Sequence, residues 1–145
     1  MRDLAIYKYI LADDIIANLR KDINNMINDL SSCCKAFNES TLFELKVVLN
    51  ELILNAVYHG NKCDLTKKVK VTTGISDNTN IFIVIEDEGC GYDLSEWRKN
   101  FSTQDNLVCI DEMKENGRGL AIVEKLCDII RFNEKGNKVV VYKKL

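Results

Sequence analysis

Three polar side chains share one stripe of a predicted helix that is otherwise largely apolar. Glu51, Asn55 and His59 follow one another at intervals of four within residues 42–59, in line with Glu44. Residues four apart lie on the same side of an α-helix, and an ionised carboxylate on a largely buried helix is costly unless a partner compensates it. The stripe is therefore either the solvent-exposed side of the helix, or the lining of a polar cavity in which a carboxylate and a carboxamide oxygen lie beside a bound metal and phosphate.

Two segments that contain pairs of glycines form the second chemical feature. The first follows a predicted strand and reads Asp87-Glu88-Gly89-Cys90-Gly91-Tyr92-Asp93, and the second, Asn116-Gly117-Arg118-Gly119-Leu120, opens a predicted helix. Glycines let a ligand approach the backbone, and the free N–H groups of a helix start bind phosphate. Ordinary hairpins and flexible loops before a capped helix also use such glycines. The P-loop pattern is missing, which excludes a P-loop, and the missing dinucleotide fingerprint disfavours a Rossmann site.

The elements that must position these residues change from helices to strands along the chain. Apolar residues at helical spacing predict helices at residues 15–30, 42–59 and about 118–127, and alternating residues predict strands at 4–10, 68–75, 80–86, 128–133 and 138–143. Asp13 or Asp14 is the expected cap of the first helix. Thr41 is expected to cap the second helix and Gly60 to end it in a left-handed conformation. Early helices and late strands favour an α+β fold, with one sheet and helices on one face.

Length, charge and cysteine spacing limit the classes of function. The chain has 145 residues, which predicts one domain, and its formal charge of -2 argues against a nucleic-acid partner. No apolar run is long enough to cross a bilayer and no signal peptide is recognisable, so we expect a cytoplasmic location and no membrane partner. The six cysteines lack C-x-x-C spacing and there is a single histidine, so we expect reduced thiols, with no disulfide framework and no zinc site.

The glutamate–asparagine helix and the two glycine segments, in this order, resemble the motifs of the GHKL (Bergerat-fold) ATPase and kinase superfamily, which includes histidine kinases. Residues 44–60 (ELKVVLNELILNAVYHG) resemble its N box, residues 87–93 its D-x-G-x-G box, and residues 117–120 its second glycine box. The wording of the N box is closest to the anti-sigma-factor serine/threonine kinase branch. The resemblance covers residues 10–145 and implies a two-layer α/β sandwich with a mixed, mostly antiparallel sheet and helices on one face.

The resemblance also implies roles for single residues toward ATP and Mg²⁺. Asn55 would bind the magnesium ion through its side-chain oxygen, and Glu51 would act as the general base. Asp87 would accept a hydrogen bond from the adenine amino group. The remaining contacts to the nucleotide would come from Gly89, Gly91, Gly117, Arg118, Gly119 and Leu120, and residues of about 92–116 would form an ATP lid.

Two functions are compatible with these motifs. One is an anti-sigma-factor-like serine/threonine protein kinase of a bacterial partner-switching system, which binds ATP or ADP, a sigma factor and an anti-anti-sigma-type phosphoacceptor. The other is a nucleotide-dependent protein-binding module of the same fold with little or no phosphotransfer. The sequence does not separate the two, because a surface that binds a partner protein leaves no motif. A homodimer is compatible with either.

Overall fold

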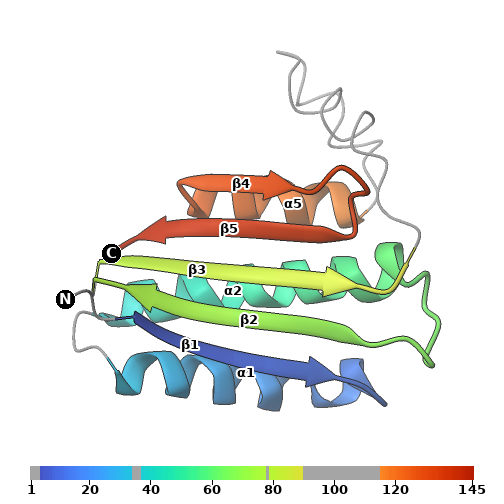
Figure 1. Ribbon diagram of the computed structural model, residues 1–145, viewed down its shortest axis with the longest axis horizontal. Coiled ribbons are helices and arrows are strands. Elements are labelled where there is room, and N and C mark those ends of the chain that lie inside the picture. Colours follow the sequence, from blue (N-terminus) through green and yellow to red (C-terminus); the bar gives the residue numbers. More distant parts are fainter. Residues whose placement is uncertain (1–3, 34–36, 78, 90–114) are drawn as a thin grey trace.

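The computed structural model describes residues 4–33, 37–77, 79–89 and 115–145, which form two layers. A five-stranded sheet lies in front in Figure 1, and the helices cover its rear face. The strands are β1 (Leu4–Leu11), β2 (Val69–Ser76), β3 (Asn80–Asp87), β4 (Ile129–Phe132) and β5 (Lys138–Lys144). The helices are α1 (Ile15–Ser32), α2 (Glu39–Asn55), the π-helical turn η1 (Ala56–Gly60) and α5 (Glu115–Leu126). The predicted α+β sandwich with helices on one face is confirmed.

The strand order β1-β2-β3-β5-β4 places β3 at the centre of the sheet. Each hydrogen-bonded pair of strands in the described part is antiparallel, so the mixed character expected of the sheet is not seen there. Asp87, the last residue of β3, lies opposite Val69 of β2 and beside the start of β5. The predicted D-x-G-x-G box therefore begins at the end of the central strand.

Helix α2 is apolar around most of its circumference because it has neighbours on three sides. It contacts α1, α5 and strand β3, and its residues Leu45, Val48, Leu49, Leu52 and Ile53 are all buried. The prediction that this helix is largely buried is confirmed. The buried residues of α1 also recur at helical spacing, namely Ile15, Leu19, Ile23, Met26, Ile27 and Leu30. None of the helices in the described residues is long and apolar enough to cross a membrane.

The predicted cap of the second helix is wrong, and that of the first helix has the predicted position without the capping hydrogen bond. Asn38, not Thr41, caps α2, because its side-chain oxygen accepts a hydrogen bond of 2.7 Å from the main-chain N–H of Thr41. The helix consequently begins at Glu39, earlier than expected. Asp14 does precede α1, but it has a left-handed conformation (φ 45°) and its side chain makes no capping hydrogen bond. A residue whose side chain caps a helix usually has an extended backbone conformation, and Asp14 does not.

A wide turn, not a left-handed glycine, ends the second helix. The N–H of Asn61 donates to the carbonyl of Ala56 at 2.7 Å, the five-residue spacing of a π-helix. Gly60 does not have positive φ. Instead, a Cβ atom on Gly60 would overlap the carboxylate of Asp87. Gly60 is therefore explained by the close approach of the helix end to β3.

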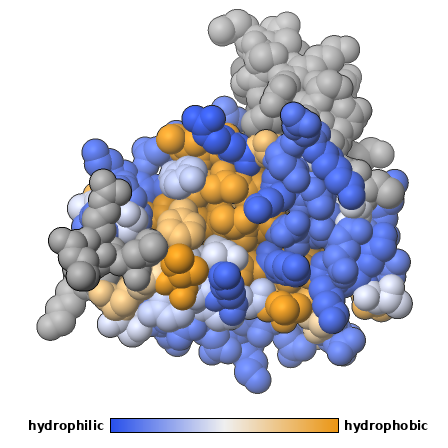
Figure 2. Space-filling model, viewed as in Figure 1, coloured by the Kyte–Doolittle hydropathy of each residue, from blue (hydrophilic) through white to orange (hydrophobic). Residues whose placement is uncertain are grey.

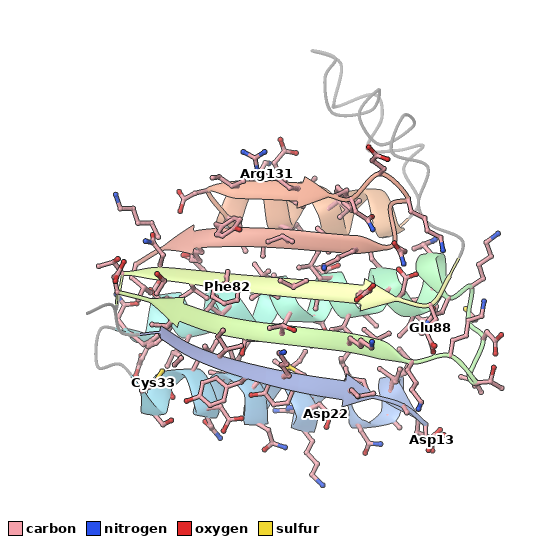
Figure 3. The ribbon with its side chains drawn as sticks, viewed as in Figure 1. Asp13, Asp22, Cys33, Phe82, Glu88 and Arg131 are labelled. Atoms are coloured by element: carbon pink, nitrogen blue, oxygen red, sulfur yellow. The ribbon has the colours of Figure 1, made fainter. Side chains whose placement is uncertain are left out.

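No helix of the described residues covers the front face of the sheet (Figure 1), and Figure 2 shows apolar side chains at its centre with polar ones around them. Phe82 of β3, which is labelled in Figure 3, lies on this face. A Cβ atom on Gly74 of β2 would overlap the ring of Phe82. The ring therefore lies over the backbone of β2 at this glycine. The packed core lies on the opposite, helical side, with the N-box residues.

We expect Asn61→Ala to destabilise the fold by about 1–3 kcal/mol, because the N–H of Glu88 and the carbonyl of Lys68, in partly buried hydrogen bonds, lose their partner. Asn61 is 2% exposed, accepts a hydrogen bond from the N–H of Glu88 at 2.8 Å and donates to the carbonyl of Lys68 at 3.1 Å. Urea denaturation measures the loss. Asn25→Ala, at an exposed site on α1, is the control, and the role of Asn61 is refuted if both variants unfold at the wild-type midpoint.

Candidate nucleotide-binding site

Residues from three separate elements meet at the edge of the sheet where β3 ends. Helix α2 contributes Glu51 and Asn55, strand β3 contributes Asp87, and helix α5 contributes Gly119 and Leu120. A Cβ atom on Gly119 would lie 2.5 Å from Oε2 of Glu51, so the start of α5 lies directly against the Glu51 carboxylate. The structure thus brings together the N box and parts of both glycine boxes, as the resemblance predicts.

Asp87 is held at the end of β3 by its own main chain and by the turn between β4 and β5. Its side chain is 7% exposed, and Oδ1 accepts a hydrogen bond from the N–H of Gly89 at 2.8 Å. Its main-chain N–H donates to the carbonyl of Asn137 at 2.9 Å, and its carbonyl accepts from Nδ2 of Asn137 at 3.3 Å. Burial raises the pKa of the Asp87 carboxyl above its ordinary value, and the Gly89 hydrogen bond offsets part of that rise. The buried carboxylate is an acceptor suited to an N–H group of a ligand.

A narrow, mostly apolar cavity lies beside Asp87. Its volume is about 20 Å³, which is room for about one water molecule. A purine base therefore enters only if the walls separate. The lining residues are Leu52, Asn55, Ala56, Ile85, Asp87 and Leu120, together with Phe132, Gly136, Asn137, Lys138 and Val139 of β4, β5 and their turn. Apolar walls with a few polar groups are typical of a small-molecule site.

Asn55 carries a buried polar atom that has no partner in the described part of the chain. The side chain is 8% exposed, and Nδ2 has no hydrogen-bond partner among the described residues. Such an atom costs about 1–3 kcal/mol, which a ligand at the cavity could recover. The described residues contain no cluster of three acidic, histidine or cysteine side chains that could hold a metal. A magnesium ion here would take one carboxamide oxygen from Asn55 and its other ligands from phosphates and water, a coordination that magnesium commonly has. The residues present fit a metal–nucleotide complex.

Glu51 lies one helical turn before Asn55 and is only partly buried. Burial raises the pKa of its carboxyl above the ordinary value, and a hydrogen bond from the Asn50 side chain lowers it in part. A raised carboxyl pKa brings the group closer to the range in which it accepts a proton effectively near neutral pH. The role of Glu51 as the general base stays a prediction, with which its partial burial and raised pKa are compatible.

The second glycine box lies inside a helix and not in a loop before it. Helix α5 begins at Glu115, so the backbone places Gly117, Arg118 and Gly119 in its first two turns. A Cβ atom on Gly119 would meet the end of the Glu51 side chain, which would have to shift. The side chain of Arg118 lies outside the described residues, as do Gly91 and nearly all of the predicted lid at residues 92–116. The contacts predicted for them stay predictions.

The sequence did not indicate several residues of the site. Glu44, predicted to share the stripe of Glu51 and Asn55, lies away from it. Gly136 and Asn137, between the last two predicted strands, and Asn61 were not singled out. The Gly-Asn pairs at 60–61 and 136–137 are the signal in the sequence. Glu44, which shares the predicted stripe, forms an ion pair of 3.1 Å with Lys143 of β5 and takes no part in the cavity.

Comparison with known proteins identifies the family of the chain. The model of the histidine kinase-like ATPase domain family matches residues 16–143, so the chain belongs to that family, as the motifs predicted. It is 31% identical over 88 residues to the serine-protein kinase RsbW of Bacillus licheniformis, covering 61% of this chain and 54% of that protein. It is 30% identical over 108 residues to the anti-sigma F factor of Clostridium perfringens strain 13, covering 72% and 73%. The chain thus spans about half the length of the first relative and nearly three quarters of the second.

We expect Asp87→Asn to weaken ADP binding by about 10- to 100-fold without destabilising the protein. Because the folded-state pKa of Asp87 is raised above 3.8, its contribution to stability is present below pH 3.8 and is lost as the pH rises through the raised value. The uncharged variant avoids that loss and keeps an oxygen for the Gly89 N–H. Calorimetric titration with ADP and thermal unfolding at pH 5 and 7 measure the two effects. Glu124→Gln, an exposed change on α5, should alter neither.

We expect alanine at Gly119 and at Gly89 to have opposite consequences for stability. The atom that a Cβ on Gly119 meets is the end of the flexible Glu51 side chain, so the helix tolerates the change. A Cβ on Gly89 would overlap the main-chain carbonyl of Gly60, which moves only if β3 and η1 separate. Gly89→Ala should therefore cost about 1–3 kcal/mol, and Gly119→Ala should keep the wild-type melting temperature or raise it. Equal melting temperatures for the two variants would contradict this packing.

Proposed function

We propose that this chain is an ATP-binding serine/threonine protein kinase of the anti-sigma-factor type, acting in a bacterial partner-switching system. The observation that carries the proposal is the position of Glu51, a partly buried carboxylate that lies against Gly119 in the first turns of α5. The start of a helix favours phosphate. A carboxylate beside it is positioned to take a proton from a hydroxyl group that approaches the same phosphate.

The proposed roles follow from the surroundings of each side chain. Asp87 would orient the base through a hydrogen bond at the end of β3, and Asn55 would hold the magnesium ion through its carboxamide oxygen. When bound, the ATP–magnesium complex supplies the phosphoryl group that is transferred. Glu51 would accept the proton of the attacking hydroxyl, and the main chain of Gly119 and Leu120 would contact phosphate. Phosphoryl transfer needs little more from a protein than such positioning and charge neutralisation.

The names of the relatives support the partner classes in this proposal. Proteins named serine-protein kinase RsbW in Bacillus licheniformis and Bacillus subtilis are 31% and 28% identical to the chain over the aligned residues. The similar protein of Clostridium perfringens is named anti-sigma F factor. We accordingly propose a sigma factor and an anti-anti-sigma-type phosphoacceptor as protein partners. Self-association into a homodimer is a separate proposal, which light scattering tests.

We expect Glu51→Gln to abolish phosphotransfer but not nucleotide binding, and Asn55→Ala to abolish both. Loss of a general base typically costs about 10²- to 10⁴-fold in rate. Asn55→Ala should still fold, because its buried Nδ2 has no partner to lose in the described part of the chain. The measurements are transfer of label from γ-labelled ATP to candidate acceptor proteins and magnesium-dependent binding of ADP. If both variants bind nucleotide and transfer label as the wild type does, the site is elsewhere.

The same assay separates a kinase from a nucleotide-dependent binding module. A kinase transfers label to the acceptor protein, and Glu51→Gln stops it. A binding module takes up ATP and a partner protein, yet no label moves to any acceptor. That second outcome would reject the kinase proposal while leaving the nucleotide site intact.

A further inference from the structure

A groove of about 610 Å³ runs between α1 and α2 and ends at Glu51. Helix α1 lines it with Ile16, Leu19, Arg20, Ile23 and Asn24, and α2 lines it with Lys46, Val47, Asn50 and Glu51. This volume is within the range of sites that bind ligands, whereas the cavity beside Asp87 has only about 20 Å³. The groove and that cavity share no lining residue, so the groove is a second site on the same central helix.

Glu51 links the groove to the nucleotide side of the molecule. Its Oε2 faces Gly119 of α5, and the residue also lines the groove on the side of α1. A base that serves a phosphoacceptor must reach the phosphate and the acceptor hydroxyl together. The groove is the path by which a hydroxyl group can arrive at Glu51 from the side opposite α5.

The floor of the groove is apolar, and each of its two sides carries a basic residue. Leu19 and Ile23 are 7% and 5% exposed, and Ile16, at 42% exposed, extends the apolar surface. Arg20 of α1 and Lys46 of α2 are exposed on opposite sides, and neither forms an ion pair within the residues that the structure describes. The chain as a whole carries a charge of -2, so two unpaired cations facing one groove favour a ligand with a carboxylate.

The dimensions suit a short stretch of extended chain. From residue 16 to residue 24, α1 rises about 12 Å, which matches about four residues of extended peptide. The two helices run in opposite directions in Figure 1, so the start of α1, with Ile16, lies beside the half of α2 that carries Glu51. A segment with its hydroxyl residue at Glu51 would therefore place residues within about four positions near Arg20 and Lys46.

We propose that the groove between α1 and α2 binds the acceptor segment of the protein substrate: a serine or threonine at Glu51, an apolar side chain on the floor, and a carboxylate between Arg20 and Lys46. This inference rests on the proposed kinase function. In the step itself, the acceptor hydroxyl oxygen forms a bond to the γ-phosphorus of ATP. The bond from that phosphorus to the bridging oxygen breaks, ADP departs with the electron pair, and the hydroxyl proton passes to the Glu51 carboxylate.

The test uses a positional-scanning library of serine-centred peptides, each with one fixed residue within four positions of the serine, and γ-labelled ATP with Mg²⁺. Exposed ion pairs contribute about 0.2–1 kcal/mol each, so two cations should favour acidic over basic peptides by about 2- to 30-fold. The charge-reversal variant Arg20→Glu/Lys46→Glu should invert that preference, raise KM for acidic peptides and leave kcat and ADP affinity unchanged. Lys8→Glu/Arg131→Glu makes the same change in net charge on the opposite face of the molecule, where Figure 3 labels Arg131, and should leave the preference as in the wild type.

Fluorescence anisotropy of the preferred acidic peptide, measured without nucleotide, separates the groove from the kinase activity. Binding that Arg20→Glu/Lys46→Glu abolishes supports the groove even if no label is transferred, and that outcome would reject only the kinase proposal. The groove proposal is overturned if ADP binds but no peptide binds or is labelled. It is equally overturned if the two charge-reversal variants bind the acidic peptide alike.

Discussion

The close contact between the end of the second helix and the end of the central strand fixes the rest of the site. Gly60 leaves no room for a side chain against the Asp87 carboxylate, and Gly89 leaves none against the carbonyl of Gly60. Backbone packed this tightly sets the distance between the helix layer and the sheet. Asn61 adds hydrogen bonds to Lys68, the residue before β2, and to Glu88, the residue after β3. The close approach of η1 to the end of β3 brings Asn55 and Asp87 to the lining of one cavity.

The electrostatic cost of that arrangement falls on the groups that bind ligand in our proposal. Burial raises the carboxyl pKa of both Glu51 and Asp87, and Asn55 buries an amide without a partner in the described part of the chain. A fold selected for stability alone would not keep three such groups around one helix end. In our proposal a ligand offsets each cost: an N–H donor for Asp87, an acceptor oxygen for Nδ2 of Asn55, and a hydroxyl proton for Glu51.

The sequence predicted the layers of the fold well and the local geometry less well. Strands β2, β3 and β5 follow from alternating residues, and the burial of α2 follows from its apolar circumference. The cap at Asn38, the π-helical turn at η1 and the start of α5 at Glu115 depend on hydrogen bonds and tertiary packing that a local pattern does not record. For the same reason the glycines were recognised as important but Gly60 was given the wrong cause. Its neighbour Asp87 is distant in sequence and close only after folding.

The central helix explains how one element can serve two ligands at once. Helix α2 has α1 on one flank and α5 on the other, so successive polar residues on it face different neighbours. Asn55 lines the cavity beside Asp87, and Asn50 lines the groove toward α1. Glu51 lines that groove too, while its carboxylate reaches Gly119 of α5. Because α2 packs against α1, α5 and β3, a nucleotide at one flank and an acceptor segment at the other would be held at a fixed separation. Positioning of that kind accounts for a large part of catalysis in phosphoryl transfer.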